Sequence, residues 1–448
     1  MNLLPIFLLW CSLFAVLGSL VGGIAGLIPG LHPNTLASVL NAFPIALFSS
    51  ILPVDVDSVP ILFGCFLVSL LLSHSMTEII VTATMGVASD DTIVALLPSQ
   101  RLHALGRGDL VIECTLIGGL GAVLTFSFLL FPLRIVFGSP IGLYSFLKPL
   151  LGIILIAICA FVMSSSRNYL RIFYSFQFFI IAGILGIIVL TLKIPSSLSI
   201  DIFGNFWSDE SSNFLLPVFT GFFAIPGLIH PMTSTTKGDL GKIPIEKIEI
   251  NKIKPLFKSL IPAVLGGWLP GITNAYATSL IMHRKRENAE TIVSACAYIV
   301  TYSATNIGGS LNSILAMATI SRYRNGILES IGDHFSYGQL LWSDIEHPPI
   351  SILAFLWAAC IGAIIGTFLC RRLGGRILKI PSIAQKEILR LSLLIFIISL
   401  VLLISGPIGV LLLFSCFALA VGAIRFSVSR IHLMGFMIVP AIAYFLTN

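Results

Sequence analysis

The sequence is poor in charge: only 10% of its 448 residues are Asp, Glu, Lys or Arg, whereas 56% are hydrophobic. A soluble domain carries about a quarter charged residues, so this composition excludes an ordinary soluble protein. No polar block of domain size interrupts the hydrophobic runs, which recur from residue 3 to residue 447. We therefore predict a single transmembrane domain over residues 1–448, all-α and polytopic.

Several other signals are missing. The eight cysteines are isolated from one another and form no CxxC or Cys/His spacing, which disfavours disulfides and zinc. The basic residues occur in short clusters and not along one amphipathic face, which disfavours nucleic acid as a partner despite the net charge of +6. The first 28 residues lack a basic start, so we expect them to remain in the mature protein. We expect no metal site and no organic cofactor.

Long apolar runs predict about ten membrane spans, because a helix needs about 20 apolar residues to cross the hydrocarbon core. Two of these runs, Ile61 to Ala88 and Ile292 to Ala318, carry polar residues at mid-depth. We expect these two to matter most for function. The other eight are Leu110 to Pro132, Ile141 to Met163, Ile172 to Leu192, Phe214 to Pro231, Ile352 to Cys370, Leu391 to Ile404, Pro407 to Ile424 and Ile431 to Leu446.

The basic residues predict the orientation of the spans. With the N-terminus outside, 21 of the 26 Lys and Arg residues fall on the cytoplasmic side, as the positive-inside rule favours. We therefore expect a multi-pass protein of the cell membrane with its N-terminus outside. The five basic residues left outside are Arg134, Lys148, Lys193, Arg322 and Arg324.

An internal repeat is centred on two Pro-Gly pairs. The stretches 22–38 and 263–279 align so that Pro29 and Gly30 fall on Pro270 and Gly271. Downstream of each pair a second match follows in the same order, SHSMTEI at 73–79 and TYSATNI at 301–307. Two matches in order indicate two related halves, which we place at 1–200 and 240–448.

The segment around the second Pro-Gly pair is too short to cross the membrane twice. About a dozen apolar residues lie on each side of the pair, between Lys258 and Arg284, and neither arm can span a core of about 30 Å. The segment should enter and return, as a hairpin with cytoplasmic flanks. The first hairpin, flanked by an uncharged N-terminus and by Asp55 and Asp57, should return to the outside. The sequence therefore predicts inverted-topology repeats.

The hairpin tips are the predicted substrate site. A Pro-Gly turn leaves backbone groups unpaired, which is tolerated in a membrane only beside protein or a water-filled cavity. A helix would start at each tip, and helix N-termini bind anions. The predicted substrate-binding residues are Pro29, Gly30, His32, Asn34, Thr35, Ser75, Pro270, Gly271, Thr273, Asn274, Ser303 and Asn306.

Glu78 is the one acidic residue deep within a predicted span, and such residues are costly unless they are paired, protonated or hydrated. We predict that Glu78, with Thr77 and Thr305, binds a coupling proton or sodium ion. His74 lies four residues earlier and can pair with Glu78 on one helix face. The alternative is a protonated Glu78 that neighbouring Ser or Asn side chains satisfy.

The remaining polar residues have two interpretations each. His32 can bind a carboxylate or carry a proton, or it can pack at the break beside the helix cap Asn34. The hydroxyl residues can line a site or bond a carbonyl one turn back. Asp90 and Asp91 follow the first polar span, where they can simply be solvated or can take part in gating.

Four elements of the sequence resemble a known family: GLIPGLHPNT near the N-terminus, MGVASDDTIVALLPSQRLHALGRGDL at 85–110, LGGWLPGITNAYAT, and IGGS at 307–310. They are similar to the permease subunit of tripartite tricarboxylate transporters (TctA-like), above all its stand-alone archaeal branch. The resemblance implies import of a small carboxylate with ion coupling, and in bacterial systems a small membrane subunit and a periplasmic solute-binding protein. The SMTE segment at 75–78 replaces a glycine-rich break of that family.

We therefore expect a secondary active transporter (permease) for a small organic anion, and not an enzyme. The rivals are a transporter of a non-carboxylate solute, an intramembrane enzyme and a channel. The sequence has no HExxH and no GxGD motif, and its polar residues cluster at two hairpins where a channel would need a continuous polar lining. The expected partners are the small-molecule substrate and the lipid bilayer, and a homodimer is compatible with the sequence.

Overall fold

The computed structural model describes residues 4–41, 58–164, 168–191, 214–229, 253–282, 291–336, 338–379 and 387–447. Within these ranges every regular element is a helix, which confirms the all-α prediction. The longer helices are α1 (Leu4–Ala25), α4 (Val59–Met85), α6 (Gly108–Phe137), α8 (Leu151–Ser164), α9 (Tyr169–Thr191), α12 (Ile253–Trp268), α14 (Ile292–Ile320), α16 (Ile350–Leu369), α18 (Glu387–Arg425) and α19 (Gly435–Thr447). The shorter ones are α2 (Pro33–Asn41), α5 (Leu96–Ala104), α7 (Leu143–Leu147), α10 (Leu215–Phe219), α11 (Ile225–Ile229), α13 (Asn274–Met282), α15 (Gly326–Gly332) and α17 (Gly375–Ile377).

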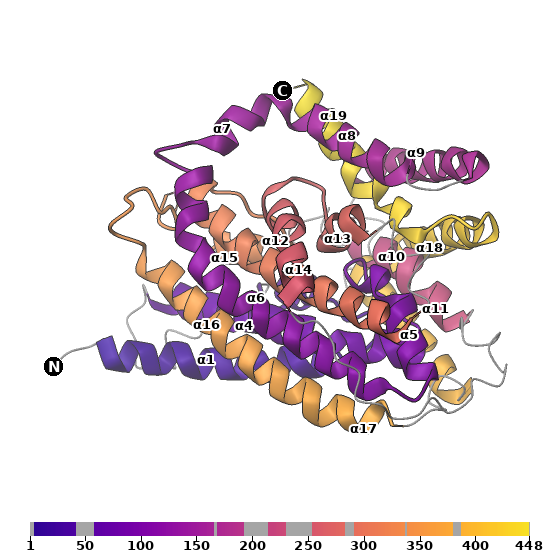
Figure 1. The fold of residues 1–448 in the computed structure, drawn as a ribbon, viewed down its shortest axis with the longest axis horizontal. Helices are drawn as coiled ribbons and strands as arrows, with labels where there is room; N and C mark the ends of the chain where they lie inside the picture. The colour runs from indigo at the N-terminus through magenta and orange to yellow at the C-terminus, as the bar shows by residue number, and fades with distance from the viewer. Residues whose placement is uncertain are drawn as a thin grey trace.

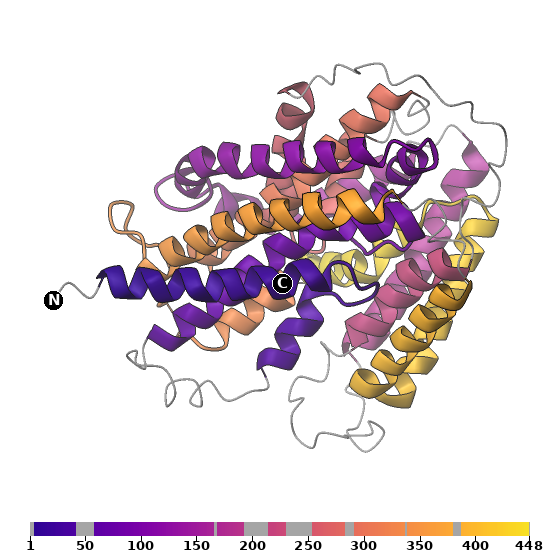
Figure 2. The same ribbon diagram turned by 90° about the horizontal axis from the view of Figure 1, so that it is seen from below.

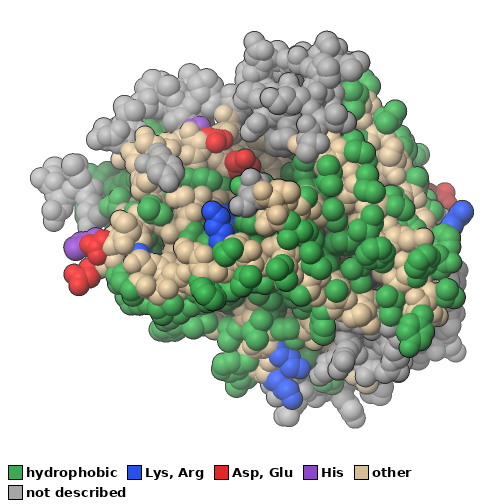
Figure 3. Space-filling model, turned by 90° about the horizontal axis from the view of Figure 1, so that it is seen from above, with side chains coloured by type: hydrophobic (Ala, Val, Ile, Leu, Met, Phe, Trp, Pro, Cys, Tyr) green, Lys and Arg blue, Asp and Glu red, His purple; other side chains and the backbone are tan. Residues whose placement is uncertain are grey.

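The outer helices expose apolar side chains that water would not tolerate. On α9, Phe173, Phe176 and Ile184 are each about half exposed, and hydrophobic side chains cover much of the described surface in Figure 3. Eight of the described helical segments are long and apolar enough to cross a membrane. An exposed apolar belt of this extent identifies a polytopic membrane protein.

The predicted spans 391–404 and 407–424 form one element, α18, with a kink between them. Gly406 has a φ of 65° inside this helix, directly before Pro407, and so breaks the helical path. The predicted span 214–231 is also not one regular helix, since a π-helical turn separates α10 from α11. α14 is 29 residues long but is not among the eight apolar segments, so the count of about ten spans stays a prediction.

The first hairpin consists of α1, a turn at residues 26–32, and α2. Gly18 and Gly22 of α1 meet Phe66 and Leu70, and Gly26, directly after α1, meets Thr77. Because the residue numbers of the contacting partners increase together along both helices, α1 and α4 run in the same direction. The chain must therefore return through α2 to the side on which it started, before it enters α4. The turn lies beside the middle of α4.

The second hairpin repeats this arrangement. Thr301 of α14 bonds the carbonyl of Pro255 in α12, and Gly267 of α12 meets Asn312 of α14. α12 and α14 are thus parallel, and the turn between α12 and α13 lies beside the middle of α14. With 16 and 9 residues, the two arms reach about 24 and 14 Å, less than the hydrocarbon core.

The two sets of helices run in opposite directions. Gly119 of α6 approaches Met76 of α4, and Ile112 lies with Ile80 around Gly374, so α6 is antiparallel to α4. Gly118 of α6 and Gly138, directly after α6, meet Ser303 and Thr319 of α14, so α14 is parallel to α6 and antiparallel to α4. By the same reasoning α16 is parallel to α4, since Gly362 and Gly366 meet Ser69 and Ser73. Figures 1 and 2 show α1, α4, α6 and α16 lying lengthwise together.

Each of these two spans therefore packs against its own hairpin and against a parallel helix from the other half of the sequence. α4 lies between α1 and α16, and α14 lies between α12 and α6. The opposite directions of α4 and α14 are the inverted arrangement that the charges predict; the boundaries of the halves at 200 and 240 stay a prediction. Asp55, Asp57, Arg167, Lys193 and the cluster Arg284–Arg286, which the topology argument uses, lie outside the described residues.

Candidate functional site

Both hairpin tips turn through a glycine in the left-handed region, as a Pro-Gly break requires. Gly30 has a φ of 81° and Gly271 a φ of 70°, values that an L side chain rarely adopts. α2 starts at Pro33 and α13 at Asn274, directly after the turns. The local sequence thus ends one helix and starts the next beside the polar segments of α4 and α14.

At the first tip, His32 satisfies the start of α2. Its Nδ1 atom accepts a hydrogen bond of 3.3 Å from the N–H of Asn34, and its carbonyl accepts from the N–H groups of Thr35 and Leu36. Its Nε2 atom lies 3.3 Å from Oδ1 of Asp90. In this conformation the first N–H groups of α2 are therefore already used by the tip itself.

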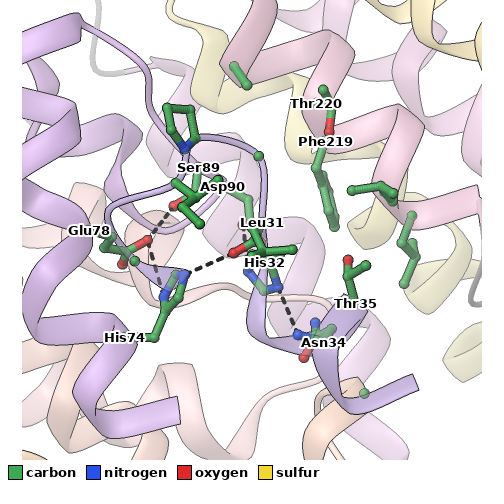
Figure 4. Close-up of a pocket in the computed structure, with 18 of the residues that line it drawn as sticks. Leu31, His32, Asn34, Thr35, His74, Glu78, Ser89, Asp90, Phe219 and Thr220 are labelled. Atoms are coloured by element: carbon green, nitrogen blue, oxygen red, sulfur yellow. Dashed lines mark hydrogen bonds and ion pairs between the residues drawn. The ribbon is translucent and has the colours of Figure 1, made fainter. Parts of the chain in front are cut away.

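Glu78 stands at the centre of a chain of polar contacts, of which Figure 4 shows the half next to the first tip. Ser89 donates to its Oε2 atom at 3.1 Å, and His74 Nδ1 lies 3.9 Å from the same oxygen. Asn306 and Tyr302 of α14 donate to its Oε1 atom at 3.3 and 3.4 Å. The carboxyl group is thus buried but surrounded by polar partners, which such a group needs at this depth.

The chain of contacts continues to both tips. His74 Nε2 lies 3.1 Å from the carbonyl oxygen of Leu31 in the first tip. On the other side Asn274, at the second tip, donates to Oδ1 of Asn306 at 3.1 Å. The tips of the two hairpins are therefore connected through Glu78.

The second tip holds a guanidinium group. Arg324 follows α14 and folds back, so that it donates to the carbonyl of Ile272 and to Asn274 Oδ1 at 3.5 Å. The backbone N–H of Asn274, at the start of α13, donates to the carboxylate of Asp91, which also feels the charge of Arg324. A carboxylate of the protein itself thus occupies the N-terminus of α13.

A cavity of about 190 Å³ opens beside the first tip. A water molecule needs about 10–15 Å³ by this measure, so the cavity has room for a small organic molecule. Its wall includes α15, α10 and the loop after α4 as well as the first hairpin. Of the predicted substrate residues, it is lined by Pro29, Gly30, His32, Asn34 and Thr35, and also by Glu78.

The chain also matches a known protein family. The model of the tripartite tricarboxylate transporter TctA family matches residues 13–435. The chain belongs to this family. It is also 27% identical over 451 residues to an uncharacterized protein of Methanocaldococcus jannaschii, with 97% of this chain and 98% of that protein covered. No solved structure matches the chain.

Other predicted site residues of this TctA-family protein make structural contacts. Thr77 and Thr305 bond carbonyls one turn back in their own helices, and Ser303 bonds the carbonyl of Thr115 in α6 at 2.8 Å. Thr273 accepts from the N–H of Tyr276. Ser75 is buried in α4. None of these residues, nor Pro270, Gly271, Asn274 or Asn306, is among the described residues that line the cavity at the first tip.

Four residues at the site were not predicted as site residues: Asp90, Asp91, Tyr302 and Arg324. From the sequence the two acids are expected only to be solvated or to take part in gating, and Arg324 only to be an external charge. The DD pair after the first polar span was the available signal, because two adjacent acids seldom follow a buried helix without a partner.

Proposed function

We propose that this TctA-family protein is a secondary active transporter that carries a small carboxylate-bearing solute together with protons. Family membership supports a permease of this general type. The observation that carries the proposal is the polar chain from Leu31 through His74, Glu78 and Asn306 to Asn274, because it joins both hairpin tips across one ionisable group.

The hydrogen-bond partners favour a proton over sodium as the coupling ion. The carbonyl of Leu31 can only accept, so His74 Nε2 carries a hydrogen. In the neutral ring Nδ1 is then bare, and it faces Glu78. A single proton therefore serves the pair, either on the carboxyl group or on Nδ1.

The position of this proton affects the hydrogen bond between His74 and the first tip. When the proton moves to Nδ1, His74 becomes a cation beside the Leu31 carbonyl and Glu78 becomes an anion. The hydrogen bond to the tip becomes charge-assisted and stronger. Protonation and the position of the first hairpin are coupled in this way, as alternating access requires.

We place the protein in the cell membrane with its N-terminus outside, on the distribution of basic residues. The TctA family includes tripartite systems, so a small membrane subunit and a solute-binding protein are candidate partners, and a homodimer is the further assembly to test.

The test is uptake of labelled succinate, glutarate and citrate into proteoliposomes under a pH gradient without sodium, and under a sodium gradient without a pH difference. One coupled proton and a gradient of one pH unit give about tenfold accumulation. Glu78→Gln should lose this accumulation but retain exchange of internal for external solute, and Asp344→Asn, an exposed control, should behave as wild type.

Accumulation under the sodium gradient alone would show that the coupling ion is sodium and not a proton. Unchanged accumulation in Glu78→Gln would show that Glu78 does not bind the coupling ion. Absence of uptake for every carboxylate by folded protein, with or without candidate partners, would refute the proposed function.

A further inference from the structure

Two threonines line the cavity at the first tip with hydroxyl groups that the protein does not use. Thr35 lies in the first turn of α2, and Thr220 starts the π-helical turn between α10 and α11. The two residues are only 8% and 4% exposed. Neither hydroxyl has a hydrogen-bond partner among the described residues, and both oxygen atoms remain accessible from the cavity. These hydroxyl groups, which Figure 4 shows among the lining side chains, are therefore free to bind a molecule there.

Threonines elsewhere in the described helices behave differently. Thr82 and Thr115, for example, bond the carbonyl one turn back in their own helix, as buried threonines commonly do. For Thr35 the carbonyl one turn back is that of Leu31, which a histidine of α4 already contacts. Thr220 lies in a π-helical turn, and such turns are frequent at functional sites. Since buried polar groups normally have partners, the two unused hydroxyls indicate a missing one.

The side chain of Asn34 adds a third donor. Its amide nitrogen also lines the cavity, is accessible, and has no partner in the described part of the chain. Hydroxyl and amide groups donate to a carboxylate, which offers about four acceptor positions. Asn34 and Thr35 both lie in the first turn of α2, where the helix dipole favours negative charge. Three neutral donors at this place suit one carboxylate group.

The rest of the cavity disfavours a second carboxylate on the same molecule. None of the described lining residues is Lys or Arg, whereas four of them are acids: Glu78, Asp90, Glu329 and Asp333. A second or third carboxylate would meet these acids and no cation to offset its charge. The proton that Glu78 and His74 share under the proposed function offsets one negative charge and not two or three.

Apolar side chains complete the wall next to the donors. Leu215 and Phe219 of α10 line the cavity on the side of Thr220, and Val81 and Ile404 line it from α4 and α18. These side chains suit the hydrocarbon part of a solute, whose burial contributes to binding.

We infer that the solute is a monocarboxylate with an apolar body, whose carboxylate the first-tip cavity binds through Thr35, Thr220 and Asn34. This inference rests on the proposed function and narrows its substrate class. Di- and tricarboxylates are then poor solutes of this chain.

The experiment compares acids that differ only in the exchange of a terminal methyl group for a carboxylate: pentanoate with glutarate, and 2-oxopentanoate with 2-oxoglutarate. Binding is measured by titrating each acid into the purified full chain and following the thermal shift. Transport is measured by uptake into proteoliposomes under the pH gradient, with protein-free liposomes to subtract passive entry. We expect the monocarboxylate of at least one pair to bind at least tenfold more tightly and to be accumulated.

The variant Thr220→Val removes the hydroxyl and should weaken binding of that monocarboxylate at least tenfold, as expected for a lost hydrogen bond to a charged group. Thr220→Ser, which retains a hydroxyl, should bind within threefold of wild type. The matched control is Thr125→Val in α6, whose hydroxyl bonds the carbonyl of Gly121 away from the cavity lining. Its affinity should be unchanged. Thr35→Val repeats the test from the other wall, in case Thr220→Val does not fold.

Equal or tighter binding of the dicarboxylate in both pairs would overturn the inference while the proposed function stands. Binding of neither member of any pair would overturn it too, as would unchanged affinity in the folded valine variants of Thr35 and Thr220. Absence of uptake of mono-, di- and tricarboxylates alike would instead count against the proposed function.

Discussion

The close contact between α1 and α4 provides a test of how the first tip is positioned. Gly22 lies so near α4 that a Cβ atom there would be 2.1 Å from the carbonyl oxygen of Leu70. Cβ atoms essentially never approach closer than 3.0 Å, so Gly22→Ala must displace the hairpin by about 1 Å. The contact between His74 Nε2 and the Leu31 carbonyl, now 3.1 Å, would then exceed hydrogen-bond distance.

We expect Gly22→Ala to destabilise the protein by about 2–4 kcal/mol. Overpacking accounts for about 1–3 kcal/mol and the lost hydrogen bond for about 1 kcal/mol. The assay is thermal unfolding in detergent with a thiol-reactive dye, because Cys11 of α1 and Cys65 of α4 are both buried and become reactive on unfolding.

The matched control is Gly375→Ala in α17, where a Cβ atom meets nothing within 4 Å and the backbone is already helical. This substitution should be neutral or stabilising by about 0.5–1 kcal/mol. If Gly22→Ala unfolds at the same temperature as Gly375→Ala, the helix contact does not position the tip and the reasoning fails.

Two further predictions concern the loop after α15. Arg134 is 2% exposed and donates to the carbonyls of Trp342 and Ser343. Arg134→Met should therefore lower the free energy of unfolding by about 2–4 kcal/mol and make the chain cleavable by chymotrypsin at Trp342. Cleavage at the wild-type rate would contradict this. His347 bonds Asp344 and holds the pKa of that carboxyl below its ordinary value of 3.8. The resulting stabilisation is present above the ordinary pKa and lost as the pH falls through the lowered one. His347→Ala and wild type should therefore differ in melting temperature at pH 7 and converge at a pH below the lowered pKa. Equal melting at both would exclude the contribution.

The sequence was informative where a feature depends on neighbouring residues. Pro29-Gly30 and Pro270-Gly271 predicted both tips because the dipeptide restricts the backbone locally. The pairing of His74 with Glu78 followed from their spacing of four residues on one helix. The charge distribution indicated the opposite directions of the two sets of helices.

The sequence was less informative where the chain folds back. Asp90, Asp91 and Arg324 each follow the end of a long helix, in positions typical of solvated loops. Their approach to the tips depends on loops that return toward the middle of the molecule, and no periodic pattern encodes such a return. The sequence likewise predicts a gap between two spans where the structure has a kink at Gly406. A break in an apolar run has the same pattern in the sequence whether the chain forms a loop there or a bend.

The exchange of packing partners between the two sets of helices has a consequence for biosynthesis. The face of α4 that contains Cys65 is completed by Ala354 of α16, whose carbonyl accepts from Cys65 and which is synthesised 289 positions later. Until then the glycine at position 64, against which the ring of Phe355 packs, has no neighbour there. The early part of the chain must therefore remain in the membrane with this face of α4 unpacked. A ribosome that stalls before residue 354 would leave an insertion intermediate in which α1 packs against α4 but not against α16.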